Sequence, residues 1–276
     1  MGTQGAPAPY IEIFSFFIQY QPMEKLPVWS ESCLVRFGAV DKSDSMTLNS
    51  IFNFFQEAAI SHAESLGVGR EAMTRTNQAW LLSRMSVQVD RRPRFGETVT
   101  VRTWPRGAEK LFTRRDYDIL DANGQAAVRA TSSWIIADII KRRPLRPQSL
   151  LENMPRNEGL DALPAPAVSL NETTTLQKCR EHPALYTDVD ANGHVNNISY
   201  IRWIEDAIDP ELLEQAKQMR MDINYLNEIL RNETTGIWAA PIETTSTGET
   251  PPPVHAFAFE GRKENQTAFR AELRLW

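Results

Sequence analysis

The fold is decided by the stretch Asp188-Val189-Asp190-Ala191-Asn192-Gly193-His194-Val195-Asn196-Asn197 and by the segment 198–208 that follows it. Short polar residues and glycine dominate the stretch; they favour turns and helix caps, so they predict a loop. In the segment behind it, isoleucines recur three or four positions apart, which predicts an amphipathic helix with one buried stripe. Asp190, Asn192 and His194 should therefore gather at the N-terminus of a buried helix, where free N–H groups and the helix dipole favour an anion.

Three interpretations of this loop compete. Asp188, Asp190, Asn192 and Gly193 match the opening of a calcium loop, but its twelfth position is Ser199, where a bidentate Glu is required. A second interpretation is an Asx-rich helix cap that carries a solvated histidine. The third is a catalytic site, and it gains weight from the rest of the chain.

The composition is that of an ordinary globular protein of 276 residues, enough for one large or two medium domains. A net charge of −5 disfavours a general nucleic-acid binder, and no apolar run is long enough to predict a membrane span. With Cys33 and Cys179 as its cysteines, the chain predicts neither a disulfide framework nor a cysteine-based metal site. A reducing compartment is expected, and no motif calls for a metal or a cofactor.

The same order of elements is predicted twice along the chain. In the first half, hydrophobic periodicity and turn residues predict a strand, a helix and an antiparallel meander: strand 32–39, helix 47–66, strands 79–89, 97–104, 112–120 and 126–137, with turns at Arg92-Pro93, Arg106-Gly107 and Asn123-Gly124. In the second half the order returns: strand 173–181, helix 195–208, a helical piece at 211–218, and strands 220–230, 236–244, 254–259 and 267–275, interrupted at 246–253 and at Gly261. A helix wrapped by an antiparallel sheet, repeated in tandem, is an α+β double hot-dog architecture.

The repetition also divides the chain. Residues 1–22 are predicted to be an extension outside the fold, 23–140 and 171–276 the two repeated units, and the proline-rich 141–170 a linker over the surface. Superposing Glu57 on Glu205 requires a shift of 148 positions, which identifies a domain duplication. On that shift the places of Asp190, Asn192 and His194 are occupied in the first unit by Lys42, Asp44 and Met46. Only the second unit is therefore predicted to keep the polar side chains.

Four stretches resemble the acyl-acyl carrier protein thioesterases of plant plastids and bacteria: 80–91, 113–117, 130–136 and 188–203. The resemblance covers roughly residues 24 to 275, and its Asp-x-Asn-x-His-Val-Asn-Asn block is quite specific to that family. It implies a double hot-dog enzyme without a cofactor. It also implies hydrolysis of fatty acyl-acyl carrier protein to free fatty acid and holo-carrier protein in fatty acid biosynthesis, with 23–140 binding the acyl chain and 171–276 catalytic.

Thioester hydrolysis requires an activated water and a stabilised oxyanion. We predict that Asn192 and helix N–H groups polarise the carbonyl or hold the water, while Asp190 orients and supports His194. The resemblance implies that Glu228, three places after a Tyr, is the base, alone or with His194. Alternation along a strand would set Glu228 among leucines, where burial raises a carboxylate pKa; the alternative is that Glu228 lies at an exposed strand end. Many plant members carry Cys after this Glu, but here the position is Ile229, so we predict attack by water.

The resemblance also implies where substrate binds. The acyl chain should enter the first unit between its helix and its sheet. The candidate lining residues are Phe52, Phe55, Trp80, Leu82 and Met85. For each of them, ordinary core packing is the alternative. The partner should be acyl carrier protein, which is acidic and carries a phosphopantetheine arm. Basic clusters are its candidate docking surface, with ordinary solvated surface as the alternative: Arg114 and Arg115, and Lys141, Arg142 and Arg143 with Arg146.

Other chemistry finds less support. Cys179 with His182 is a possible nucleophile pair, but we favour the interpretation that they are a small buried strand residue and a surface histidine. His62 and His255 are predicted to be structural. No Gly-x-Ser-x-Gly elbow, P-loop or dinucleotide glycine pattern occurs. The alternatives are an acyl-coenzyme A thioesterase and a non-catalytic acyl-binding or dehydratase-like hot-dog protein. Monomer and homodimer stay open, as do bacterial cytoplasm, which we favour, and plastid stroma.

Overall fold

The computed structural model describes residues 26–147, 154–244, 249–264 and 266–276. Its first half contains two helices and six strands in those ranges: β1 (Trp29–Leu34), α1 (Leu48–Ser65), α2 (Arg70–Arg75), β2 (Gln78–Val89), β3 (Thr98–Glu109), β4 (Phe112–Leu120), β5 (Ala126–Asp138) and β6 (Arg143–Leu145). The second half follows the same plan: β7 (Gln177–Pro183), α4 (Asn197–Glu205), α5 (Pro210–Gln215), β8 (Met219–Tyr225), β9 (Thr234–Pro241), β10 (His255–Lys263) and β11 (Gln266–Leu275). The predicted extension at 1–22 lies outside the described residues.

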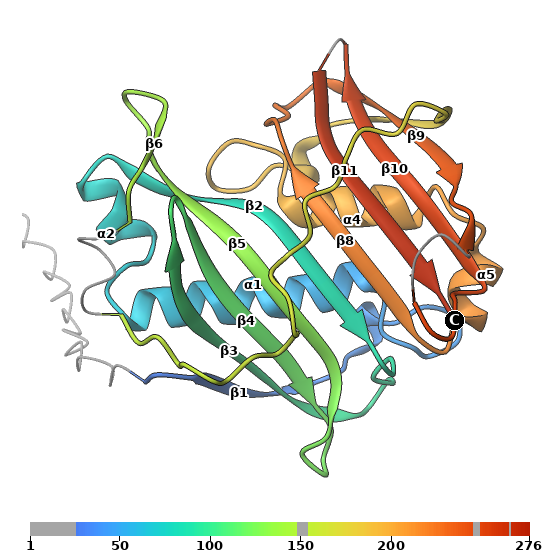
Figure 1. Ribbon diagram of the computed structural model, residues 1–276, viewed down its shortest axis with the longest axis horizontal. Coiled ribbons are helices and arrows are strands. Elements are labelled where there is room, and N and C mark those ends of the chain that lie inside the picture. The colour runs from blue at the N-terminus through green and yellow to red at the C-terminus, as the bar shows by residue number, and fades with distance from the viewer. Residues whose placement is uncertain (1–25, 148–153, 245–248, 265) are drawn as a thin grey trace, which may run out of the picture.

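All the long strands belong to one antiparallel sheet in the order β1-β3-β4-β5-β2-β8-β11-β10-β9-β7, with the short β6 beside β5. The two halves meet where β2 pairs with β8, and the strand order reads the same from both outer edges toward this seam. Each half of the sheet curls around one helix, α1 or α4 (Figure 1). This is the predicted tandem hot-dog architecture.

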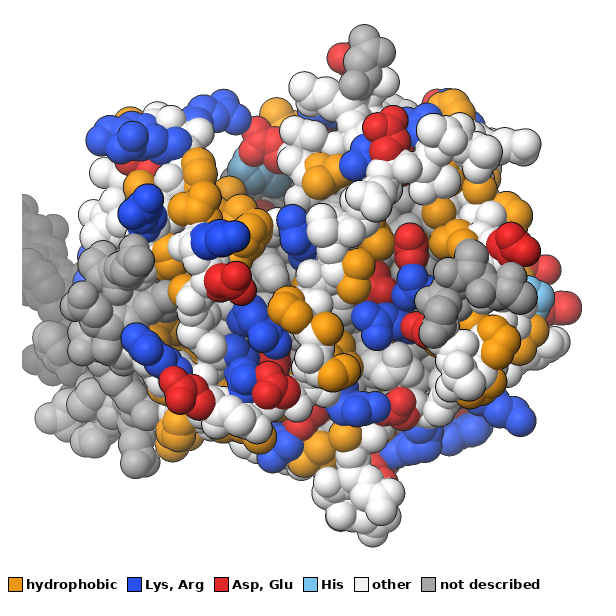
Figure 2. Space-filling model, in the orientation of Figure 1, with side chains coloured by type: hydrophobic (Ala, Val, Ile, Leu, Met, Phe, Trp, Pro, Cys, Tyr) orange, Lys and Arg blue, Asp and Glu red, His pale blue; other side chains and the backbone are white. Residues whose placement is uncertain are grey.

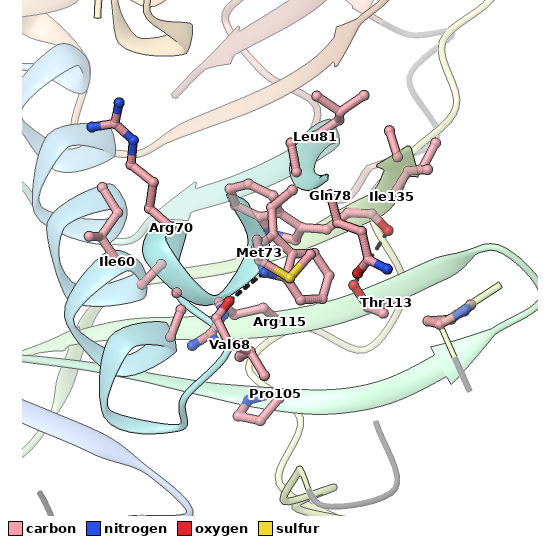
Figure 3. A pocket seen from close by; sticks show the side chains of 18 of the residues that line it. Ile60, Val68, Arg70, Met73, Gln78, Leu81, Pro105, Thr113, Arg115 and Ile135 are labelled. Carbon is pink, nitrogen blue, oxygen red and sulfur yellow. Dashed lines mark hydrogen bonds between the residues drawn. The ribbon is translucent and has the colours of Figure 1, made fainter. Parts of the chain in front are cut away.

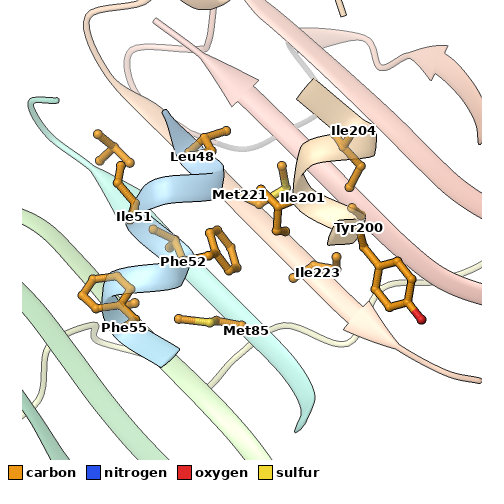
Figure 4. Packing of buried hydrophobic residues seen from close by; sticks show 14 of the residues in the cluster. Leu48, Ile51, Phe52, Phe55, Met85, Tyr200, Ile201, Ile204, Met221 and Ile223 are labelled. Atoms are coloured by element: carbon orange, nitrogen blue, oxygen red, sulfur yellow. The ribbon is translucent and has the colours of Figure 1, made fainter. Parts of the chain in front are cut away.

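The helix of the first half is positioned by its cap and its apolar stripe. Thr47 Oγ1 accepts the Ser50 N–H, and the chain leaves the helix through Gly67 at a φ of +74°. Such a positive φ favours glycine because a Cβ would be strained. Phe52 and Phe55 are buried against the sheet, and in Figure 4 they face Met85 across the same core that continues to α4.

A one-residue bulge sets the register between the two halves. In β7 the pairing with β9 skips Cys179, whereas β1 pairs with β3 without interruption. The shift between corresponding residues is therefore 148 before Cys179 and 149 from there through the loop and α4, so that the helix caps Thr47 and Asn196 correspond. The prediction of 148 for the loop and helix is wrong by one position, because a β-bulge adds a residue to one strand only.

Several predicted boundaries also change. The strand predicted at 220–230 ends at Tyr225, and the segment predicted as strand 32–39 is β1 followed by a 3₁₀ turn. Gly107 and Gly261 lie inside strands, where the register shifts, instead of ending them. The predicted turn at Asn123-Gly124 is confirmed, since Gly124 has a φ of +76° between β4 and β5.

The chain between the halves covers the outer face of the sheet. Leu160 O accepts the Trp104 indole N–H at 2.8 Å, and Leu170 N–H donates to Asn224 Oδ1 at 2.9 Å, so these contacts hold the segment on both halves. Ala162 and Leu163 of this segment are buried. Within the ranges that the structure describes, no helix is both long and apolar enough to cross a membrane.

Glu205, the last residue of α4, connects the two helices. Its carboxylate accepts the N–H groups of Leu48 at 2.7 Å and Asn49 at 3.0 Å, so it occupies the N-terminus of α1. Burial raises the pKa of Glu205 to about 7, although the two N–H bonds oppose the rise. The ionised carboxylate is thus costly in this position, and the helix N-terminus only partly offsets that cost.

We expect Glu205→Gln to change how stability depends on pH. A carboxyl whose pKa is raised on folding adds stability below its unfolded pKa of about 4.5 and loses it as pH rises through about 7. The unfolding free energy of the wild type should fall, relative to the variant, by about 3 kcal/mol over this window. Urea unfolding at pH 5 and pH 8 measures it, with the exposed Glu211→Gln as control. Parallel pH profiles for wild type and Glu205→Gln would contradict the assignment.

Candidate active site

The polar loop before α4 is closed by its own backbone. Asp190 N–H donates to His194 O at 2.9 Å, Gly193 N–H donates to Asp190 O at 3.0 Å, and Gly193 has a φ of +85°. The Asp190 carboxylate accepts the Asn192 N–H at 2.8 Å, which is an Asx turn. The tight turn presents the imidazole of His194 beside the start of the helix.

The start of α4 has an open donor. Asn196 caps the helix by accepting the Ile198 N–H at 3.0 Å, and its carbonyl accepts the Ser199 N–H. Among the described residues, nothing accepts the N–H of Asn197, the first residue of the helix. Because the helix dipole adds partial positive charge here, this N–H favours a negatively charged oxygen.

A second loop brings Glu228 to His194. Val195 N–H donates to Ile229 O at 2.8 Å, and a β-bridge joins His194 to Leu230. These contacts place His194 Nε2 3.3 Å from Glu228 Oε2, with side chains that are 42% and 45% exposed. The predicted burial of Glu228 on a strand is wrong, because β8 ends at Tyr225 and the neighbouring leucines are exposed as well.

The first half of the chain reaches this pair. Arg142, in the turn between β5 and β6, places a guanidinium nitrogen 3.1 Å from Glu228 Oε1. Arg70, the first residue of α2, donates to Ala191 O at 2.8 Å. Neither contact was predicted, since nothing in the sequence indicates which distant loop an exposed arginine touches.

Two expectations for the loop change. The Asp190 carboxylate bonds to Asn192 and, among the described residues, makes no hydrogen bond to the imidazole, so it supports His194 through the loop backbone. Asp188 is 4% exposed, and its carboxylate already accepts hydrogen bonds from Arg202 and from the Leu185 N–H. It is not free to bind calcium.

The loop before α1 carries a different residue in the place of His194. Its bond from Asp41 N–H to Ser45 O, at 2.9 Å, matches the bond from Asp190 N–H to His194 O. Ser45 thus occupies the place of His194, and the assignment of Met46 to that place is wrong for the register reason given above. Ser45 and Met46 are both buried, at 8% and 0% exposed, so neither faces an open site.

The counterpart of Glu228 in the first half is an arginine. The second loop is held in the same way in both halves, by Met46 N–H to Pro93 O and by Val195 N–H to Ile229 O, each 2.8 Å. The residue that precedes each acceptor is Arg92 or Glu228, respectively. Arg92 is buried and pairs with Asp41 at 2.5 Å. A structural ion pair therefore fills the first site, while the second keeps an accessible His and Glu.

A large pocket begins at the His194–Glu228 pair and extends into the first half. Its volume is ≈ 1760 Å³, and its walls come from α1, α2, β2, β4 and β5 as well as from the loops that carry Asp190 and Glu228. Figure 3 shows the part lined by Ile60, Val68 and Met73, where the Trp80 indole donates to Val68 O at 2.8 Å. The pocket thus joins a polar end to a largely apolar one.

The five residues predicted to line an acyl slot do not all lie in the pocket. Trp80 lies in the pocket wall. Phe52, Phe55 and Met85 are at most 4% exposed and belong to the core in Figure 4, and Leu82 is half-buried but is not among the described residues that line the pocket. The pocket instead follows the next face of α1, through Gln56, Ala59, Ile60 and Ala63.

The two predicted basic clusters differ as well. Arg115 is 8% exposed and donates to His62 Nδ1 and Thr103 Oγ1, so it cannot belong to a docking surface. Because side chains alternate along β4, Arg114 lies on the opposite face of the sheet from Arg115, near Asp116 and Asp161. The second cluster, Lys141, Arg142 and Arg143, is exposed at the tip beside β6, where Figure 2 shows basic side chains gathered.

The remaining histidines and the cysteine pair have other roles. Cys179 is the bulge residue of β7; its thiol contacts Ile237 O at 3.2 Å, and burial raises its pKa. His182 stacks on Trp203 at 5.4 Å between ring centroids, so this arrangement does not support a nucleophile pair. His62 is fully buried, with Nε2 2.9 Å from Leu26 O, and burial together with Arg115 lowers its pKa to about 4. His255 is exposed at the start of β10.

Comparison with known proteins gives the family context. The model described as the acyl-ACP thioesterase N-terminal domain matches residues 27–151, and the one described as the acyl-ACP thioesterase C-terminal domain matches residues 171–271. A chloroplastic palmitoyl-acyl carrier protein thioesterase of Gossypium hirsutum is 29% identical over 218 residues, which cover 74% of this chain and 53% of that protein. Oleoyl-acyl carrier protein thioesterase 2 of Arabidopsis thaliana is 27% identical, with coverages of 81% and 64%. The chain spans about half the length of the first of these relatives.

Solved structures show the same fold. An acyl-ACP thioesterase from Bacteroides thetaiotaomicron superposes with a TM-score of 0.79 at 23% identity, covering 91% of this chain and 98% of the other. The 12:0-ACP thioesterase from Umbellularia californica gives 0.78 at 21% identity, with coverages of 92% and 95%. Since the two family models together match most of the chain in the order of its two halves, the chain belongs to the acyl-ACP thioesterase family.

Proposed function

We propose that this protein hydrolyses the thioester of fatty acyl-acyl carrier protein and releases free fatty acid and holo-carrier protein in fatty acid biosynthesis. One observation carries the proposal: His194 and Glu228, 3.3 Å apart, lie at the polar end of a pocket whose apolar part can take an acyl chain. Ion pairs alone are common on surfaces, but this one borders a pocket and an open helix N-terminus. These observations support a role for His194 and Glu228 in chemistry on a bound acyl group.

Glu228, together with His194, acts as the general base. The pair takes a proton from water while the water oxygen bonds to the thioester carbon, and the electron pair of the C=O bond moves to oxygen. Asn192 and the open Asn197 N–H stabilise that oxyanion at the start of α4. When the intermediate collapses, the C–S bond breaks, and the proton held by the pair passes to the thiolate. Ile229 is apolar and fully buried, so the position after Glu228 supplies no nucleophile and the proposed attack is by water.

Arg142 holds the carboxylate of Glu228 from its other side. Its side chain is 80% exposed, so the pair contributes little to stability in water. The contact nevertheless holds one carboxylate oxygen of Glu228 while the other faces His194. The turn between β5 and β6 in this way links the first half of the chain to the catalytic pair.

The carrier protein is proposed to dock on the exposed cluster of Lys141, Arg142 and Arg143, since a carrier protein is acidic. We expect Lys141→Glu with Arg143→Glu to lower kcat/KM for acyl-carrier protein about tenfold at low salt, and less at high salt. The same acyl chain on N-acetylcysteamine lacks the carrier and should be unaffected. Lys217→Glu, near α5, is the control. Equal losses for both substrates would reject the docking role.

Carrier specificity is tested directly. Purified protein is incubated with a series of acyl-carrier proteins and the matching acyl-coenzyme A thioesters, and free fatty acid is measured by chromatography. We expect faster release from the carrier protein. Preference for coenzyme A would favour the acyl-coenzyme A thioesterase, and the absence of release from either would favour a non-catalytic acyl-binding protein. Bacterial cytoplasm is the proposed compartment, with plastid stroma as the alternative, and either a monomer or a homodimer is compatible with the site.

A further inference from the structure

Helices α1 and α4 occupy equivalent positions on the two sides of the seam of the sheet. They run in opposite directions, so that Leu48 lies near Ile204 while Phe55 lies at the level of Tyr200 (Figure 4). The N-terminus of each helix is thus close to the later turns of the other. At the start of α1 this neighbour is Glu205, whose carboxylate takes two N–H groups at 2.7 and 3.0 Å.

The bulge at Cys179 determines which residue plays the same part at the start of α4. With the caps Thr47 and Asn196 superposed, Glu205 corresponds to Gln56. Burial supports this register, because 50–52 and 199–201 are all buried and both are followed by an exposed residue, Asn53 or Arg202. The shift of 148 inferred from sequence would have selected Glu57, which is exposed.

The side chain of Gln56 borders the pocket, where it can contact a ligand. It is half-buried and lines the pocket together with His194, Asn197 and Glu228. Among the described residues, neither its amide nor the Asn197 N–H has a hydrogen-bond partner. Two donors without acceptors therefore border the pocket, whereas at the start of α1 the carboxylate of Glu205 occupies the corresponding position.

We propose that Gln56 is a fifth residue of the active site and donates its amide N–H to the thioester carbonyl oxygen bound at the start of α4. The inference rests on the proposed hydrolysis. At α1 the protein supplies its own oxygen anion through Glu205, and that helix N-terminus is filled. At α4 a neutral amide leaves the N–H free, and the substrate oxygen takes the place that Glu205 takes in the other half.

The difference between amide and carboxylate is the decisive chemistry. An amide can donate to an oxygen that becomes negative in the transition state, and such donors strengthen as charge develops. A carboxylate in its place would accept the Asn197 N–H itself and would repel the oxyanion. One side chain therefore decides whether a helix start is a structural cap or an oxyanion site.

Gln56→Glu tests the proposal. We expect kcat for acyl-carrier protein to fall about 10²–10³-fold at pH 8, the range seen for loss of an oxyanion donor, with a smaller change in KM. The ratio of variant to wild-type activity should recover as pH falls, because protonation removes the introduced charge. Gln56→Met, of similar size but unable to donate, should lose activity without this recovery. Asn53→Asp makes the same amide-to-acid change one turn earlier on the exposed face and should keep wild-type kcat.

The outcomes separate the two proposals. An inactive wild type would remove the proposed function, whereas an active wild type with Gln56→Glu and Gln56→Met within threefold of it would overturn the role of Gln56 alone. Thermal unfolding of each variant shows whether it is folded. A loss for Gln56→Glu that is equal at all pH values, and absent in Gln56→Met, would also contradict donation by the amide.

Discussion

His194→Ala should lower kcat for acyl-carrier protein hydrolysis about 10²–10⁴-fold, the usual contribution of a positioned acid–base group, and Glu228→Gln should do the same. The imidazole and the carboxylate are 3.3 Å apart and border the pocket, so each variant leaves the other group without its partner. Both side chains are more than two-fifths exposed, and removing them should therefore leave the fold intact.

The double variant makes this test sharper. If the two residues act as one unit, His194→Ala with Glu228→Gln should lose little more than either single change, because the effects of such residues do not add. His255→Ala, at an exposed position on β10, is the matched control and should keep full activity. Single turnover with acyl-carrier protein measures the chemical step. Losses under tenfold in both single variants would exclude the mechanism.

Ala63→Phe should shorten the acyl slot and change chain-length preference. Ala63 lines the pocket on α1, about 10 Å further along the helix than Gln56 at 1.5 Å per residue. A phenyl ring there occupies space that a long chain needs and a short chain does not. We expect kcat/KM for hexadecanoyl-carrier protein to fall about 10- to 100-fold relative to the octanoyl substrate, given what one misplaced group costs in an apolar pocket.

The same ring on the surface provides the comparison. Ala122→Phe adds it at an exposed position in the β4–β5 hairpin, and both chain lengths should then be hydrolysed at wild-type rates. Equal losses for the long and the short substrate in Ala63→Phe would indicate damage to the site, not a shorter slot. Unchanged preference would place the acyl chain elsewhere in the pocket.

Local patterns were sufficient for the helices, most strands and the loop that carries His194. Isoleucine spacing after a stretch of short polar residues predicted α4, and the polar turn before it depends on contacts within a few residues. Such contacts are specified by neighbouring side chains and backbone conformation, so a sequence shows them. The tandem hot-dog architecture followed from the repeated order of these elements.

Only the tertiary structure decided which face of a strand or helix each side chain occupies and which residues of the two halves correspond. Strand β4 turns Arg115 inward against His62, and α1 directs Gln56 and Ala63, not Phe52, into the pocket. The bulge at Cys179 moved the correspondence between the two loops and between α1 and α4 by one residue.

The proposed catalytic pair shows the same limit. Glu228 and His194 meet because Val195 bonds to Ile229, and Arg142 arrives from the other half of the chain. The sequence by itself therefore determined which groups and elements are present, because these depend on near neighbours. Packing decided which groups meet, because one residue of register or one turn of a helix redirects a side chain to another surface.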